Sequence, residues 1–223
     1  MHNRRAAVFS ILYLLSSILI FPLCGCNVVG AAANALPPPI ITPQYKGLAG
    51  QSVGVLVWAD RGIHIDWPSL PLDTAGAIQN QLQAKQKDKL KELRDTQFPV
   101  KPASIIRYMR DHPELENTDI TQVAPRFGVT RLIYVEVNDF STRAAASLEL
   151  FRGSMGGSMK VIEIQNGQAK VVYEENNLRA VFPPNVPEDG TVRGNDPQFY
   201  AGTVQAFATQ VVWRLVPHRE ENP

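Results

Sequence analysis

The stretch MKVIEIQNGQAKVVYEE, residues 159–175, holds two strand-like runs of apolar and β-branched residues with a two-residue break between them. Asn166 and Gly167 form the break, and this dipeptide is favoured in two-residue β-hairpins because both positions tolerate positive φ. The sequence therefore predicts a hairpin of two antiparallel strands, and the neighbouring segments are expected to complete the sheet.

Three upstream segments predict further strands. SVGVLVWA, residues 52–59, is a β-branched apolar run that predicts a central strand, and RLIYVEV, residues 131–137, predicts another. A short strand is expected near residues 97–100. Between and after these strands, the chain carries helical patterns.

The first helical pattern covers residues 72–94, where Ile78, Leu82, Leu90 and Leu93 fall near one face. Asp73 or Thr74 is expected to cap its start. A second helix is predicted to begin at Pro102, because proline is well suited to the first helical position, and to end before Pro113.

Two more helices are predicted further along the chain. ITQVAPRF follows the capping residues 117–119 and is expected to end at Gly128. The last helix is expected to be capped by Asp196-Pro197 and to stop at Pro217, with apolar residues at i+3 and i+4 intervals: Tyr200, Val204, Phe207, Val211 and Leu215.

The predicted fold is α/β (α+β), a single three-layer-like domain with a mixed β-sheet and helices packed on it. Its expected element order is β-α-β-α-α-β-β-β-α. We assign the domain to residues 45–217 and a polar C-terminal tail to residues 218–223, because the 223-residue chain is too short to argue for two cores.

The N-terminus has the layout of an export signal. MHNRR is a short basic head, and the uncharged apolar run from Ala6 to Phe21 follows it. That run is shorter than the ~20 residues that a membrane-spanning helix needs, and Pro22 comes directly after it. A cleaved signal peptide, residues 1–25, is therefore favoured over a permanent span.

Both cysteines of the chain lie at the end of this signal. The sequence Leu23-Cys24-Gly25-Cys26 resembles the lipobox of bacterial lipoproteins, and this resemblance implies cleavage between Gly25 and Cys26 and lipidation of Cys26 by acyl chains such as palmitate. A disulfide or a zinc site is disfavoured, because cysteines two apart rarely meet disulfide geometry and a single C-x-C supplies too few metal ligands.

Residues 26–44 predict a tether. Small residues come first and a cluster of three prolines, Pro37 to Pro39, follows, which favours extended and disordered structure. Asn27 stands where some bacteria read an aspartate as an inner-membrane retention signal. We therefore expect a membrane-anchored lipoprotein of the cell envelope that faces the periplasm, with the outer membrane favoured.

The net charge and the motifs missing from the sequence argue against several classes of function. Removal of residues 1–25 takes away Arg4 and Arg5, which leaves 20 basic and 21 acidic residues and a formal charge of −1. This balance argues against nucleic acid as a partner. The chain has no phosphate loop, dinucleotide fingerprint, G-x-S-x-G or H-E-x-x-H motif, so neither a cofactor nor an enzymatic activity is expected.

One group of residues offers a rival interpretation. Asp60, His64 and Asp66 follow the strand at residues 52–59, and loops at strand ends often hold ligands. These side chains either bind a divalent metal, as in a metal-dependent hydrolase, or form a polar turn beside Trp58 and Trp67. Both readings stay open from the sequence.

Three other segments have candidate roles. The basic residues Lys85, Lys87, Lys89, Lys91 and Arg94 form either a solvated face with pairs such as Asp88 with Lys91, or a contact for anionic lipid heads or acidic wall polymer. The proline-rich loop at residues 182–197 is a second candidate contact. Ser154 and Ser158 lie in a glycine-rich run that favours close packing or a bulge over a nucleophile.

The order of elements, with VGVLVWA, VAPRFGVTRLIYVEV and the hairpin, resembles the curli-secretion lipoprotein superfamily, which includes penicillin-binding-protein activator lipoproteins and the N-terminal domain of TolB. The phrases FRGSM (151–155) and AVFPP (180–184) resemble a group of uncharacterised bacterial lipoproteins. We therefore expect a non-enzymatic, lipid-anchored module that binds an envelope protein or cell-wall partner. The alternatives are the metal-dependent hydrolase and a structural subunit of an export assembly, although residues 141–157 are too short to supply two membrane strands.

Overall fold

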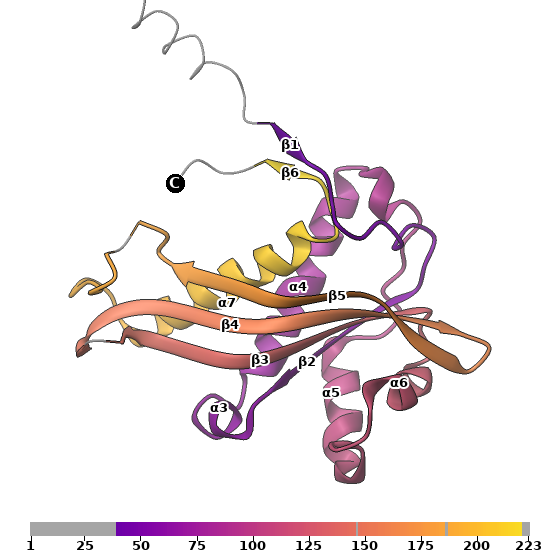
Figure 1. Cartoon of the computed structure of the whole chain (residues 1–223), viewed down its shortest axis with the longest axis horizontal. Coiled ribbons are helices and arrows are strands. Elements are labelled where there is room, and N and C mark those ends of the chain that lie inside the picture. The colour runs from indigo at the N-terminus through magenta and orange to yellow at the C-terminus, as the bar shows by residue number, and fades with distance from the viewer. Residues whose placement is uncertain (1–38, 146, 186, 220–223) are drawn as a thin grey trace, which may run out of the picture. The chain divides into compact units, whose positions relative to one another are not determined.

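The computed structural model describes residues 39–145, 147–185 and 187–219 (Figure 1). Ile41–His218 form one compact unit, whereas Ile40 and Arg219 belong to a second unit that lies mostly outside the described ranges. A two-stranded sheet is formed by β1 (Ile40–Ile41) and β6 (His218–Arg219). The features below belong to the larger unit.

The main sheet has four strands in the order β2-β3-β4-β5. Its members are β2 (Val53–Ala59), β3 (Arg131–Ala144), β4 (Ser147–Gln165) and β5 (Gln168–Phe182). β2 pairs with β3 in parallel, from Val53 opposite Arg131 to Ala59 opposite Val137, and the other two pairs are antiparallel. The mixed α/β sheet expected from the sequence is therefore confirmed.

The hairpin around Asn166 and Gly167 is also confirmed. Gln165 pairs with Gln168, and the two residues between them have φ of 53° and 76°. Positive φ at both central positions is the geometry that matches the right-handed twist of the flanking strands. This turn fixes the register in which β4 and β5 present their side chains.

The helices fall into a long pair and a group of shorter elements. The long ones are α4 (Leu70–Lys87) and α7 (Asp196–Trp213). The others are α3 (Arg61–Asp66), η2 (Lys91–Leu93), α5 (Pro102–Asp111), η3 (Pro113–Leu115), α6 (Ile120–Val123) and η4 (Ala124–Phe127).

Several predicted helix ends are confirmed. Pro102 opens α5, and the Asp119 side chain accepts a hydrogen bond from the Thr121 backbone N–H at the start of α6. Gly128 adopts a left-handed conformation, with φ of 67°, where η4 ends. The cap predicted at Asp196 is one residue off: the N-cap of α7 is Asn195, which accepts from the Gln198 N–H, and Asp196 is the first helical residue.

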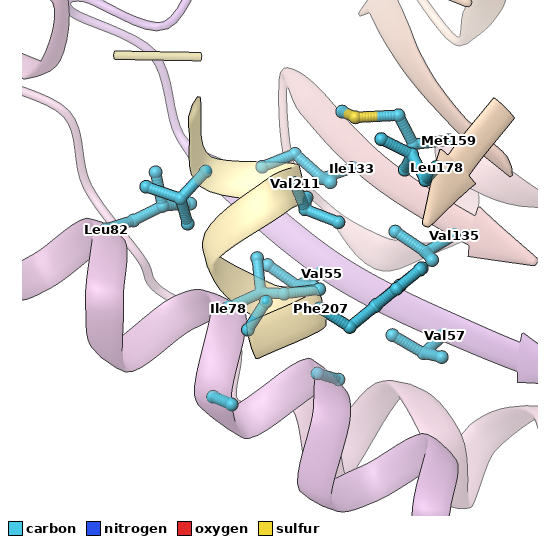
Figure 2. Close-up of a cluster of buried hydrophobic side chains, with 14 of the residues drawn as sticks. Val55, Val57, Ile78, Leu82, Ile133, Val135, Met159, Leu178, Phe207 and Val211 are labelled. Atoms are coloured by element: carbon cyan, nitrogen blue, oxygen red, sulfur yellow. The ribbon is translucent and has the colours of Figure 1, made fainter. Parts of the chain in front are cut away.

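Helices cover both faces of the sheet. α4 and α7 pack on one face, where Val55, Ile133 and Phe207 belong to the larger core, and Figure 2 shows these side chains between the two helices and the strands. α5, α6 and η4 cover the other face only near the start of β2, where Leu56, Leu132 and Ile162 line a second core. The arrangement is three-layered there and two-layered toward the far ends of the strands.

Two predicted elements differ from the structure. The helix expected over residues 72–94 begins earlier, after Ser69, and ends at Lys87, because Lys89 takes a positive φ of 58° and the chain turns into η2. The turn buries Leu93 and lets Gln86 Nε2 donate to the Thr96 carbonyl at 2.6 Å. The strand expected near residues 97–100 is reduced to one bridge between Ser52 and Gln97.

The glycine-rich segment lies within the long strand β4. Of residues 141–157, β3 includes those up to Ala144 and β4 those from Ser147, and the register shifts near Val137 and Gly157 confirm the expected bulge. A Cβ at Gly153 would lie 1.8 Å from Thr203 Oγ1 of α7. The absence of a side chain there is what lets α7 lie close on β4.

A partly buried ion network fixes the start of the domain on the sheet. The Arg131 guanidinium donates to Glu163 Oε2 at 2.6 Å and to the Tyr45 hydroxyl at 3.0 Å, and Lys170 Nζ lies 2.9 Å from Glu163 Oε1. The hydrogen bond from Lys170 and the charge of Arg131 hold the pKa of Glu163 below its ordinary value. Strands β3, β4 and β5 and the segment before β2 are thereby joined.

This network predicts an acid-sensitive contribution to stability. The pKa of Glu163 is lower in the folded chain than in the unfolded chain, so its ionised form stabilises the fold above the ordinary value of 4.5. That contribution is lost as pH falls below 4.5 and through the lowered folded pKa. We expect Glu163→Gln to lower the urea midpoint at pH 7 but to make it less dependent on pH between 5 and 3, roughly the range over which such carboxylates titrate. If the urea midpoint of the variant falls between about pH 5 and 3 as steeply as that of the unaltered protein, the stabilising role given to ionised Glu163 is contradicted.

Candidate functional site

The predicted lipidation site lies outside the described residues. Leu23, Cys24, Gly25 and Cys26 all precede residue 39, so cleavage and acylation stay predictions from the sequence. In the part of the chain that the structure describes, the helices are too short or too polar to cross a bilayer.

The predicted metal group does not form. Asp60 is the N-cap of α3, and His64 and Asp66 lie on that helix, all three exposed. At ~100° per residue, His64 and Asp66 project about 200° apart around the axis, so these side chains do not converge on one ion. No cluster of three or more His, Cys, Asp or Glu side chains suited to a metal occurs in the described ranges. Asp60, His64 and Asp66 therefore do not form the metal group on which the hydrolase alternative was built.

An aromatic cluster supports α3 where the helix ends. The Trp67 ring stacks on Tyr200 of α7, with centroids 5.4 Å apart and planes at 25°, and meets Phe140 of β3 edge-on at 5.2 Å. Phe140 and Tyr200 are also in edge contact, at 5.6 Å. Each such pair contributes about 0.5–1.5 kcal/mol beyond its buried area, so Trp67 is held in a fixed orientation.

Hydrogen bonds fix the Tyr200 side of this cluster. The Tyr200 hydroxyl donates to Asp73 Oδ2 at 2.7 Å and lies 3.1 Å from Ser69 Oγ. Burial raises the pKa of Tyr200 well above its ordinary value, and the Asp73 carboxylate raises it further. The phenol is a neutral donor at physiological pH, and it joins the start of α4 to α7.

Apolar side chains are exposed above this support. None of the residues of α3 is buried, and the Ile65 side chain is 69% exposed. Leu72, one turn into α4, is 41% exposed, and Trp67 is half-buried. We call Ile65, Trp67 and Leu72 the α3 surface. Of the three, Trp67 is the one whose ring is fixed by the aromatic cluster. Large aliphatic and aromatic side chains of this kind are common in protein-binding surfaces.

The α3 surface was missed from the sequence, although one signal was present. The segment RGIHIDWP carries Ile63, Ile65 and Trp67 with polar residues between them. Read as a loop, this pattern directs interest to the polar residues. In a short helix that packs along one side, Ile63 and Ile65 cannot both be buried, so the pattern indicates that one of them is exposed.

The other sequence candidates are spread over the domain. The five basic residues at positions 85–94 are exposed, and Lys91 pairs with Glu92 at 3.8 Å instead of with Asp88. Ser154 and Ser158 lie within β4, and the Ser158 hydroxyl donates to Glu136 Oε2 at 3.4 Å. In the loop at residues 182–197, Thr191 pairs with Phe151 of β4. These groups do not form one site.

A shallow pocket of about 240 Å³ lies at the hairpin turn. Its lining is mainly polar and comprises Glu163, Gln165, Asn166, Gln168, Ala169 and Lys170. Because α3 follows Ala59, at the opposite end of the strands from this turn, the pocket and the α3 surface are separate features.

Comparisons with known proteins give similarities in structure only. No family model matches the chain, and no curated protein matches it. The PelC dodecamer of Paraburkholderia phytofirmans is 12% identical, with a TM-score of 0.43 over 80% of this chain and 97% of that one. Lipoprotein GNA1162 of Neisseria meningitidis is 10% identical, with a TM-score of 0.40 over 72% and 97%.

The hypothetical protein CT253 of Chlamydia trachomatis is 15% identical, with a TM-score of 0.36 over 58% of this chain and 71% of that one. The similar structures thus include one named as a lipoprotein. At these identities no residue's role is carried over to this chain, and the superfamily resemblance stays a prediction.

Proposed function

We propose that this chain is a lipid-anchored accessory protein of the bacterial envelope, and that its domain binds an envelope protein through the α3 surface. The observation that carries the binding role is α3 itself, a helix in which no residue is fully buried and which exposes Ile65 two positions before the braced Trp67. The role is non-enzymatic in this proposal.

The anchor is supported by the order of features in the first 44 residues. A basic head, an apolar run, Leu23-Cys24-Gly25-Cys26 and a proline-rich segment follow one another and then lead into the domain. Acyl chains on Cys26 would hold the protein at a membrane, because each buried methylene contributes about 0.8 kcal/mol. The proposed location is the periplasmic side of the envelope, with the outer membrane favoured.

The binding role is supported by the physical character of the α3 surface. A side chain that is ordered before binding loses less conformational entropy when a partner covers it. Trp67 is ordered by Phe140 and Tyr200, and Tyr200 by Asp73. Exposed Asp60, His64 and Asp66 lie around the apolar residues, as the polar rim of an interface does. A partner with an apolar contact and a polar margin fits this surface.

Intact mass of the membrane-extracted protein tests the anchor. We expect a mass that corresponds to a chain starting at Cys26 plus acyl chains, and we expect Cys26→Ala to lose both the cleavage and the added mass. An unmodified mass that retains residues 1–25 in the unaltered protein would overturn the anchor, whatever the outcome for the binding surface.

Site-specific photo-crosslinking in intact envelopes tests the binding surface. A crosslinking amino acid in place of Ile65 is expected to yield a discrete higher-mass product that contains one envelope protein. The matched control replaces Arg107, which is exposed on α5, and is expected to yield no such product. Equal products at the two positions, or none at Ile65, would contradict the proposed surface.

A further inference from the structure

The turn that follows α4 carries a concentration of positive charge. Its five basic side chains are all exposed: Lys85, Lys87, Lys89, Lys91 and Arg94. We call these residues the basic turn. Two exposed carboxylates, Asp88 and Asp95, lie among them, whereas Glu92 is only 7% exposed and faces inward. The outward charge of the turn is therefore clearly positive.

The charge of the basic turn is not used within the domain. Lys85, Lys87, Lys89 and Arg94 have no acidic group within 4.0 Å in the described part of the chain, and Lys91 reaches Glu92 only at 3.8 Å. By contrast, Lys160 and Lys170 on the sheet each pair with a glutamate. The basic turn thus differs from the lysines on the strands, which form ion pairs with glutamates of the sheet.

The basic turn has a fixed conformation. Gln86 Nε2 donates to the carbonyl groups of Leu93 and Thr96, at 3.3 and 2.6 Å, so the turn is tied back to the last residues of α4. Leu93 is fully buried. Because the backbone of the turn is already fixed, contact with an anionic surface requires no further ordering of the main chain there.

The basic turn lies beside the start of the domain. The Gly50 N–H donates to the Arg94 carbonyl at 2.8 Å, and Thr96 Oγ1 donates to the Leu48 carbonyl at 2.9 Å. Lys46, also exposed, precedes these contacts by two residues. Figure 1 shows the end of α4 next to the indigo segment that leads into β2. The end of the domain that carries the charge is thus the end at which the chain enters.

The length of the preceding chain limits how far the domain can move from the anchor. Ile41 lies fifteen positions after Cys26, and a fully extended chain spans at most about 3.6 Å per residue, or roughly 50 Å. A tether of this length keeps the entry end of the domain at a high effective concentration near the bilayer. Anionic head groups of that bilayer are then within reach of that end.

We infer that the basic turn, with Lys46, docks on anionic phospholipid head groups of the membrane that holds the N-terminal lipid. This inference rests on the proposed lipid anchor. The contact would turn the entry end of the domain toward the bilayer. Each lysine near an anionic surface strengthens such binding about five-fold. Added salt shortens the Debye length and so weakens the binding.

Lysine reactivity on vesicles tests the inference. The full chain, extracted from membranes with its lipid, is incorporated into vesicles of phosphatidylcholine with or without phosphatidylglycerol, and acetylation of each lysine is followed by mass spectrometry. We expect Lys85, Lys87, Lys89 and Lys91 to react about five-fold more slowly on the anionic vesicles. Lys160 and Lys170 should react equally on both, and high salt should remove the difference.

A pair of matched variants sharpens the test. Lys87→Gln, Lys89→Asn and Lys91→Gln together remove three charges from the basic turn, and asparagine suits the positive φ at position 89. The control removes three charges from α5 and η4 with Arg107→Gln, Arg110→Gln and Arg126→Gln. Protection of Lys85 by anionic vesicles should disappear in the first variant and persist in the second. Far-UV circular dichroism confirms that both are folded.

The outcomes separate this inference from the proposed function. If the chain lacks the lipid, it does not float with phosphatidylcholine vesicles, and the proposed anchor is overturned. The acetylation rates of the lysines can still be measured after the chain is mixed with anionic vesicles, so the inference is tested separately. Equal lysine reactivity on both vesicle types overturns the inference while the anchor stands. Protection by soluble polyglutamate but not by phosphatidylglycerol also overturns it and indicates an acidic polymer as the partner.

Discussion

Phe207→Ala is expected to lower the free energy of unfolding by about 3 to 5 kcal/mol, the range found when a phenylalanine is truncated in a close-packed core. Phe207 is fully buried on α7. Figure 2 shows its ring directed toward Val57 and Val135 of the sheet, with Ile78 of α4 beside it. Truncation would leave a cavity where two helices and the sheet meet, and no neighbouring element is free to fill it.

Urea unfolding followed by far-UV circular dichroism measures this loss. Phe207→Leu is the matched variant, because it retains most of the apolar volume and should give a clearly smaller loss. A loss below about 1 kcal/mol for Phe207→Ala would show that the core relaxes around the cavity and would contradict the packing described for α7.

The second large effect is expected from a single methyl group at Gly157. A Cβ at this position would lie 2.2 Å from the Glu136 carbonyl oxygen, and that oxygen belongs to the backbone of β3, the strand paired with β4. A side chain can rotate away from such a contact, but a paired strand cannot. We expect Gly157→Ala to cost about 3 kcal/mol, the upper part of the range for overpacking, measured as a lowered urea midpoint.

The adjacent glycine provides the control for this prediction. A Cβ at Gly156 would have its nearest contact at 3.4 Å, from Asp139 Cβ, which is ordinary van der Waals distance. Gly156→Ala should therefore leave stability unchanged or raise it slightly, because alanine restricts the unfolded chain more than glycine does. If the two variants lose the same stability, the loss reflects glycine in a strand and not the close approach of β3.

The parts of the fold that the sequence predicted are those whose structure depends on local signals. Asn166 and Gly167 adopt the backbone conformation that their residue types favour, and Gly128 ends η4 in the left-handed region. Pro102 and Asp119 begin helices for reasons contained in a few neighbouring residues. In such cases the intrinsic preference of the chain and the packing of the domain agree.

The elements that differ are those in which packing outweighs the local preference. Lysine favours helix, yet Lys89 takes a positive φ because the chain must turn there to bury Leu93. The close packing expected at the glycine-rich run is present, but the sequence did not identify α7 and β3 as the elements that Gly153 and Gly157 allow to approach β4. The length of β3 and β4 therefore depends on contacts with residues that are distant in sequence.

The candidate site was also predicted from local signals only in part. The strand that precedes Asp60 was predicted correctly, and interest in the segment after it was justified by its place at a strand end. The sequence did not show that this segment forms α3, which separates His64 from Asp66 and exposes Ile65. Nor did it show that Phe140 and Tyr200, 73 and 133 positions after Trp67, brace that tryptophan.

The parallel pairing of β2 with β3 also has a consequence for the order in which the strands of the sheet are synthesised and paired. β3, β4 and β5 follow one another closely along the chain and are expected to pair early, whereas Ser52 bonds to Thr130 across 78 positions. Contacts that close such long loops form late because their entropic cost comes first. The apolar segment VGVLVWA is therefore synthesised before the other strands of its sheet and pairs after them. A ribosome must add nearly eighty residues before that strand has a neighbour, and a holding chaperone has its clearest target there.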